Sequence, residues 1–232
     1  MQKRKPAVCR RADIAEVLDS AQPGDVIAFS GKGAVSEIVR WSTRSVVSHV
    51  GMVCRSRIGR ADGDGSIETV DIVESTMLGT DMATGQPVRG VQRRSLSDRV
   101  RFADGPVWWL PLSDDARGRL DLRAMTAFVL EHSAKPYDLP QAIGAGLDAM
   151  DGLPGLGRST RNREDFAAMF CSELVAGSLE AGGVTGRINA SEVTPIDLCM
   201  FTLYGDAYVQ LTGEETRITG VNTVDPEGFG LR

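Results

Sequence analysis

Apolar runs separated by turn-forming residues dominate the first half of the chain. "DVIAFS" at 25–30, "VVSHVGMVC" at 46–54 and "ETVDIVES" at 68–75 each have the β-branched and apolar residues typical of a strand. The segment between the last two, "RSRIGRADGDGS", is rich in turn residues, so 46–54 and 68–75 are expected to pair as a hairpin. Three further strands are predicted at "GVQRRSL", "GPVWWLPL" and "AYVQL".

Other segments carry apolar residues three or four positions apart, which is the helical period. This pattern predicts helices at "ADIAEVLDS", "AVSEIVRWSTR", 114–133 and "MFCSELVAGSLEA", the last one ended by the glycine pair that follows it. Strands followed by helices indicate an α+β architecture, with an antiparallel sheet or small barrel packed against helices.

The length of 232 residues suits one sizeable domain. We expect residues 1–22 to form an N-terminal arm with a short helix, 23–212 a single domain, and 213–232 a C-terminal tail. The Gly-rich stretch 140–163 has little periodicity and is predicted to be a loop within that domain.

Composition and charge exclude several classes of function. A net charge of -5 and a pI near 5.2 provide no basic footprint for nucleic acid. No stretch reaches the roughly 18 apolar residues of a membrane span, so no integral membrane association is expected. The N-terminus lacks the apolar part of a signal peptide, and the four cysteines contain no C-x-x-C pair, which together favour the cytoplasm. With only two histidines, a metal site is not expected.

His49 stands in the middle of an otherwise apolar strand. Side chains alternate along strands, so His49 shares a face with Gly51 and Val53, and Glu74 shares one with Ile72. Direct pairing would place His49 opposite Glu74, and a slip of two residues would make them diagonal neighbours. A carboxylate beside an imidazole orients a catalytic base, although a buried pair that serves only the fold fits the same pattern.

Cys171 is the best candidate for a nucleophile among the four cysteines. It follows "AAMF" at the expected start of a helix, where unpaired N–H groups and the helix dipole favour a thiolate. The alternative is that Cys171 is a small buried hydrophobe. The residues alone leave both interpretations open, and they do not decide whether Glu74 or Asp71 is the partner of His49.

The series "GDVIAF", "IVRWSTRSVVSHVGMV", "VDIVEST", "KPYDL", "FCSELVA" and "SEVTPIDL" resembles the circularly permuted NlpC-type cysteine hydrolases of papain-like fold, in particular the YiiX-like group. The resemblance covers about residues 23–200. It implies a Cys171–His49–Glu74 triad in permuted order, without metal or organic cofactor. It also implies a role for Tyr137 in "KPYDL" beside the developing oxyanion.

The resemblance implies a thiol hydrolase that cleaves an amide bond in a peptide or peptide-like substrate through an acyl-enzyme. The first alternative is an acyltransferase or lipid acyl hydrolase similar to lecithin:retinol acyltransferase, with the apolar part of 140–163 as a lid. The second is a non-catalytic binding protein on the same fold. The oligomeric state is not determined by the sequence.

Overall fold

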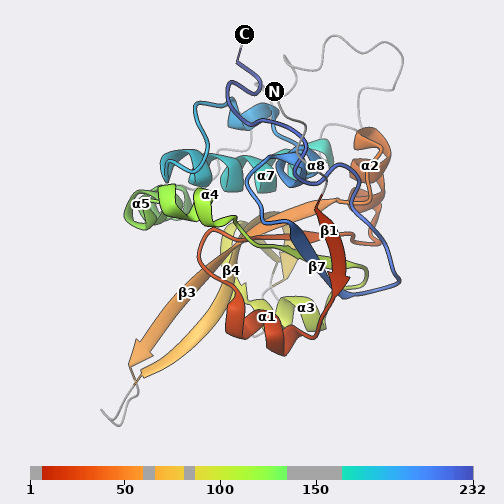
Figure 1. Cartoon of the computed structure of the whole chain (residues 1–232). Helices are drawn as coiled ribbons and strands as arrows, with labels where there is room; N and C mark the ends of the chain where they lie inside the picture. The colour runs from red at the N-terminus through yellow and green to blue at the C-terminus, as the bar shows by residue number, and fades with distance from the viewer. Residues whose placement is uncertain (1–6, 60–65, 81–86, 135–163, 232) are drawn as a thin grey trace.

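A single twisted sheet organises the chain, and helices cover both of its faces (Figure 1). The computed structural model describes residues 7–59, 66–80, 87–134 and 164–231. Its strands are β1 (Val8–Arg11), β2 (Val26–Phe29), β3 (His49–Gly59), β4 (Ser66–Thr80), β5 (Pro87–Ser95), β6 (Val107–Leu110) and β7 (Ala207–Thr212). Its helices are α1 (Ile14–Ser20), α2 (Ala34–Thr43), α3 (Leu96–Arg101), α4 (Asp114–Arg119), α5 (Leu122–Ala134), α7 (Glu164–Ala181) and α8 (Pro195–Met200), with a 3-10 turn at Ala190–Glu192.

The strands follow the order β1-β7-β6-β2-β3-β4-β5 across the sheet. Every neighbouring pair is antiparallel except β1 and β7, which run parallel. The α+β class predicted from the strand and helix patterns is therefore confirmed. The long β3–β4 hairpin extends away from the helices at one side of the molecule (Figure 1).

Two buried clusters hold the sheet between its helical layers, as adjacent tryptophans illustrate. Trp108 lies in the cluster that also contains Cys171 and Val175 of α7, whereas Trp109 packs with Leu96 of α3 on the other face. Successive side chains of a strand point to opposite faces, so the "WW" pair contributes one large ring to each cluster. Each indole N–H is satisfied: Trp108 donates to the Thr216 carbonyl and Trp109 to the Asp25 carboxylate.

The N-terminal arm and the C-terminal tail differ from what the sequence suggested. Residues 8–11 of the arm are strand β1, which pairs with β7 at the edge of the sheet. The segment after β7 is packed, because Ile218 and Val221 are buried in the core and the Asn222 side chain donates to the carbonyl of Tyr204. Neither end has an amphipathic repeat, so periodicity could not reveal contacts that depend on distant strands.

The single helix predicted over 114–133 is two helices in the structure. Helix α4 ends at Arg119, and Leu120 has an extended conformation. The Asp121 carboxylate then accepts hydrogen bonds from the backbone N–H groups of Arg123 and Ala124, at 2.9 and 3.1 Å, at the start of α5. The aspartate acts as the cap of a new helix, which is why the apolar period continues across a break in the backbone.

The register of the β3–β4 hairpin fixes which side chains meet. Met52 pairs with Val73 and Val53 with Ile72, which is slipped by two residues from a direct pairing of His49 with Glu74. Of the two registers predicted, the structure has the one that makes His49 and Glu74 diagonal neighbours. Gly51 then lies opposite Glu74, where a Cβ atom would come within 2.5 Å of the Ile72 Cδ1 atom.

Gly51→Ala is expected to lower the free energy of unfolding by about 1 to 3 kcal/mol, because the added methyl group overpacks the sheet beside Ile72. Urea denaturation measures the change. Gly118→Ala in α4 is the matched control, since no atom lies within 4 Å of its Cβ position and alanine favours a helix. Equal stability of the two variants would show that the close approach at Gly51 is not a constraint.

Candidate functional site

His49 and Glu74 form a direct contact across β3 and β4. The His49 Nε2 atom lies 2.7 Å from the Glu74 Oε2 atom. Glu74 is 1% exposed, while the His49 side chain retains 20% of its exposure, so the carboxylate is enclosed and the imidazole reaches the surface. The diagonal arrangement is what the slipped register of the hairpin allows.

Asp71, the other acid considered from the sequence, does not share this position. Its carboxylate accepts hydrogen bonds from Arg93 at 2.7 Å and from the Thr69 hydroxyl at 3.3 Å. Asp71 also pairs in register with Cys54. Glu74 is therefore the acid that contacts His49, because strand alternation turns Asp71 toward the other face.

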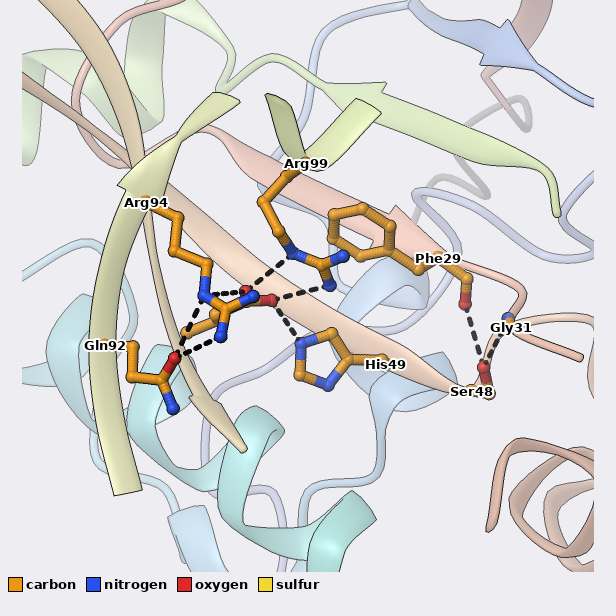
Figure 2. A network of polar contacts seen from close by, with 8 residues as sticks. Phe29, Gly31, Ser48, His49, Gln92, Arg94 and Arg99 are labelled. Carbon is orange, nitrogen blue, oxygen red and sulfur yellow. Dashed lines mark hydrogen bonds and ion pairs between the residues drawn. The ribbon is translucent and has the colours of Figure 1, made fainter. Parts of the chain in front are cut away.

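Two arginines near Glu74 were not identified from the sequence. Arg99 of α3 donates from Nε to Glu74 Oε1 at 2.6 Å and from Nη2 to Oε2 at 3.0 Å. Arg94 of β5 is more distant, with Nε 3.9 Å from Oε1. Figure 2 shows Arg94, Arg99 and His49 converging on the same carboxylate. The sequence shows only a group of arginines between 89 and 101, which resembles an ordinary solvated face.

The Phe29 ring packs beside these charged side chains. The guanidinium carbon of Arg99 lies 4.6 Å from the centroid of the Phe29 ring. Phe29 pairs in register with His49, and their ring centroids are 5.6 Å apart. Phe29 thus contacts both cationic partners of Glu74 and restricts how far either side chain can move.

Cys171 lies on the other side of the imidazole. The Cys171 thiol forms a hydrogen bond with the His49 side chain, so β3, β4 and α7 bring the three predicted residues together. Because Glu74 occupies Nε2, the ring nitrogen that remains for Cys171 is Nδ1. Cys171 is fully buried.

The expectation that Cys171 begins a helix is wrong. Helix α7 begins at Glu164, about two turns before Cys171. The backbone N–H of Cys171 is therefore used inside the helix, and the unpaired N–H groups of the first turn belong to earlier residues. The sequence offered no clear starting signal, because "REDFAAMF" consists of residues that fit either a helix or its preceding loop.

The environments of His49 and Glu74 shift both pKa values toward an ion pair. Burial by itself lowers the pKa of His49, but the charges and hydrogen bonds of Cys171 and Glu74 outweigh it and raise the pKa to about 10. Burial raises the pKa of Glu74, yet His49 and Arg99 overcome this and lower it to about 2. At neutral pH the pair is an imidazolium beside a carboxylate.

Two other cysteines have environments that suppress ionisation. Burial raises the pKa of the Cys54 thiol to about 11, against the charge of nearby Arg93. Burial also raises the pKa of Cys199 far above its ordinary value, and the charges of Asp197 and Cys171 raise it further. All four cysteines lie in described residues and are thiols. Cys171 is the cysteine that has an imidazole beside it.

Some predicted features fall outside the described residues or have no structural counterpart. Tyr137 and the Gly-rich stretch 140–163 lie outside the described residues. Within the described residues, no group of three histidine, cysteine, aspartate or glutamate side chains is arranged to hold a metal ion. None of the described helices combines the length and apolar character needed to cross a membrane.

Comparisons with known proteins reveal only distant structural likenesses. No family model matches the sequence, and no curated protein matches it. The fold is similar to the "Crystal structure of metalloprotein yiiX from Escherichia coli O157:H7, DUF1105", at 17% sequence identity and a TM-score of 0.38. The match covers 69% of this chain and 66% of that chain, slightly less than two thirds of its length. The permuted papain-like topology stays a prediction from the sequence.

Glu74→Gln is expected to reduce the free energy of unfolding by about 3 to 5 kcal/mol near pH 5.5, because it removes one partner of a buried ion pair. The lowered pKa of Glu74 gives stability that is present above pH 4.5 and lost as the pH falls toward 2. The raised pKa of His49 gives stability that is present below pH 6.5 and lost as the pH rises through 10. The difference from the parent protein should therefore be largest between pH 4.5 and 6.5.

Urea denaturation of both proteins across this pH range checks the prediction. The matched control is Glu68→Gln. Glu68 lies on β4 like Glu74, but its ion pair with Arg55 of β3 is partly exposed, so this variant should change stability by about 1 kcal/mol or less. A difference for Glu74→Gln that does not vary with pH would contradict the ionised pair.

Proposed function

We propose that this protein is a thiol hydrolase that cleaves an amide bond in a peptide or peptide-like substrate. One observation carries the proposal: the His49 imidazole lies between the Cys171 thiol and the Glu74 carboxylate. Covalent acyl transfer requires a nucleophile that contacts a base and an acid that orients this base. Cys171, His49 and Glu74 have this order of contacts. If the His49–Glu74 pair only stabilised the fold, no thiol would be needed beside the second ring nitrogen of His49.

In this mechanism, His49 takes the proton of the Cys171 thiol, with which its side chain forms a hydrogen bond. The Cys171 sulfur forms a bond to the substrate carbonyl carbon, and the carbon–nitrogen bond breaks as the His49 imidazolium gives its proton to the leaving amine. A water molecule, deprotonated by His49, then attacks the thioester. This step releases the carboxylic acid and restores the Cys171–His49 pair.

Glu74 contributes by orienting the imidazole. Its carboxylate accepts a hydrogen bond from His49 Nε2, which leaves Nδ1 directed to the thiol and stabilises the imidazolium. The backbone N–H of Cys171 is used within α7, so it is not the oxyanion donor in this conformation. The Tyr137 hydroxyl stays the proposed donor for the oxyanion.

A non-catalytic binding protein is the second candidate, and the burial of Cys171 favours it. The Cys171 side chain belongs to the apolar core between α7 and the sheet and is 0% exposed. A hydrolase must open a path to this sulfur, whereas the His49 side chain beside it is already partly exposed. A binding protein needs no such path and has a thiol without enhanced reactivity.

Iodoacetamide labelling followed by peptide mass spectrometry separates the two functions. At pH 6 an ordinary thiol of pKa about 8.5 is roughly 0.3% ionised. If His49 stabilises a thiolate, Cys171 should react at least about tenfold faster than Cys9 at this pH. The advantage should disappear in His49→Ala, because the imidazolium is removed.

Cys9 is the internal reference, since it lies on the edge strand β1 and is partly exposed. The His132→Ala variant is the matched control for loss of a histidine, because that side chain is on α5 and bonds to the Phe128 carbonyl. A Cys171 thiol that stays unlabelled while Cys9 reacts, or that labels equally fast without His49, would contradict the hydrolase and favour the binding protein.

A further inference from the structure

Arg99 binds both oxygens of the buried Glu74 carboxylate. Its Nε and Nη2 atoms donate to Oε1 and Oε2 at 2.6 and 3.0 Å, so the guanidinium and the carboxylate meet edge to edge. The same Oε2 atom accepts the hydrogen bond from His49. The Oε2 atom of Glu74 therefore accepts hydrogen bonds from both Arg99 and the imidazole.

The second arginine beside Glu74 is held by another group. Arg94 donates from Nε and Nη2 to the Gln92 side-chain oxygen at 2.9 and 2.6 Å, and its Nε stays 3.9 Å from Glu74 Oε1. Gln92 pairs in register with Glu74 and so holds Arg94 at the margin of the site (Figure 2). Of these two arginines, Arg99 is therefore the one that hydrogen-bonds to both oxygens of the carboxylate.

Packing restricts Arg99 to this position. Helix α3 is anchored by Leu96 and Val100, which are buried in the same cluster as Trp109. The Phe29 ring lies against the guanidinium and also contacts the His49 ring, so one aromatic side chain packs against both Arg99 and His49. A solvated surface arginine would have neither the two-point contact nor this support.

We propose that Arg99 is a positioning residue that moderates the basicity of His49 by sharing the Glu74 carboxylate. Burial lowers the pKa of His49, while Cys171 from α7 and Glu74 from β4 raise it. Arg99 from α3, and Arg94 from β5 at a greater distance, bring positive charge to the same carboxylate, and a like charge disfavours the imidazolium. Without Arg99 the whole carboxylate charge acts on His49, and the imidazolium gives up its proton less readily. The catalytic meaning of this inference rests on the proposed hydrolase.

The test is a histidine-ring NMR titration in a Cys171→Ala background, which removes the thiol and the increase that it causes in the pKa of His49. Arg99→Met should raise the pKa of His49 by about 1 pH unit, because one adjacent positive charge is lost. Arg99→Lys keeps the charge and should restore at least half of that shift. His132, the second histidine of the chain, provides an internal reference in each spectrum.

Arg101→Met is the matched control, since Arg101 is an exposed arginine on the same helix that stacks on Phe102. It should leave the His49 titration unchanged. Arg99→Gln provides the same charge removal with a polar side chain in case the methionine variant fails to fold. A merely structural role predicts the opposite sign, because loosened packing returns His49 toward its ordinary pKa of 6.5.

An unchanged or lowered pKa of His49 in the folded Arg99 variants would overturn the proposal. This outcome is distinct from failure of the hydrolase, because the titration uses a protein without the Cys171 thiol. If Cys171 proves unreactive while Arg99→Met still raises the pKa of His49, the positioning role stands and only its catalytic meaning is lost.

Discussion

The Glu74 carboxylate is a buried charge in the sheet, and the surrounding structure must satisfy it. An isolated ionised carboxylate in an apolar interior costs several kcal/mol. Here His49 and Arg99 compensate it from β3 and α3, while Gly51 leaves the opposite position on the sheet without a side chain. The hairpin register, the small residue at 51 and the position of α3 are all consistent with this one requirement.

The same charge connects the fold to its chemistry. Glu74 holds the imidazole of His49 by Nε2, and Nδ1 is then the nitrogen available to Cys171. Arg99 donates a hydrogen bond to the same carboxylate and lies against the Phe29 ring. The carboxylate is thus held by several side chains at once, as the hydrolase proposed above would require for orienting His49.

Elements with a strong local pattern were predictable. The apolar runs of β2, β3 and β4 and the amphipathic period of α2 lie where the sequence indicated them. Prediction failed where the local sequence pattern does not decide the structure. One continuous apolar period predicted a single helix, but a capping aspartate begins a new helix, so the structure has α4 and α5. Strand β1 was missed because it forms through its pairing with β7. Helix α7 begins earlier than its sequence suggested, since nothing in "REDFAAMF" marks the boundary.

The sequence by itself determined the strand alternation that turns His49 and Glu74 to one face, and it singled out Cys171 as the candidate thiol. Only the tertiary structure decided which of two registers the hairpin adopts, because both keep the apolar faces matched. It also decided that Arg99, among several nearby arginines, meets the carboxylate. Helix α3 supplies that contact through packing of Leu96 and Val100, and such packing depends on residues distant in the chain.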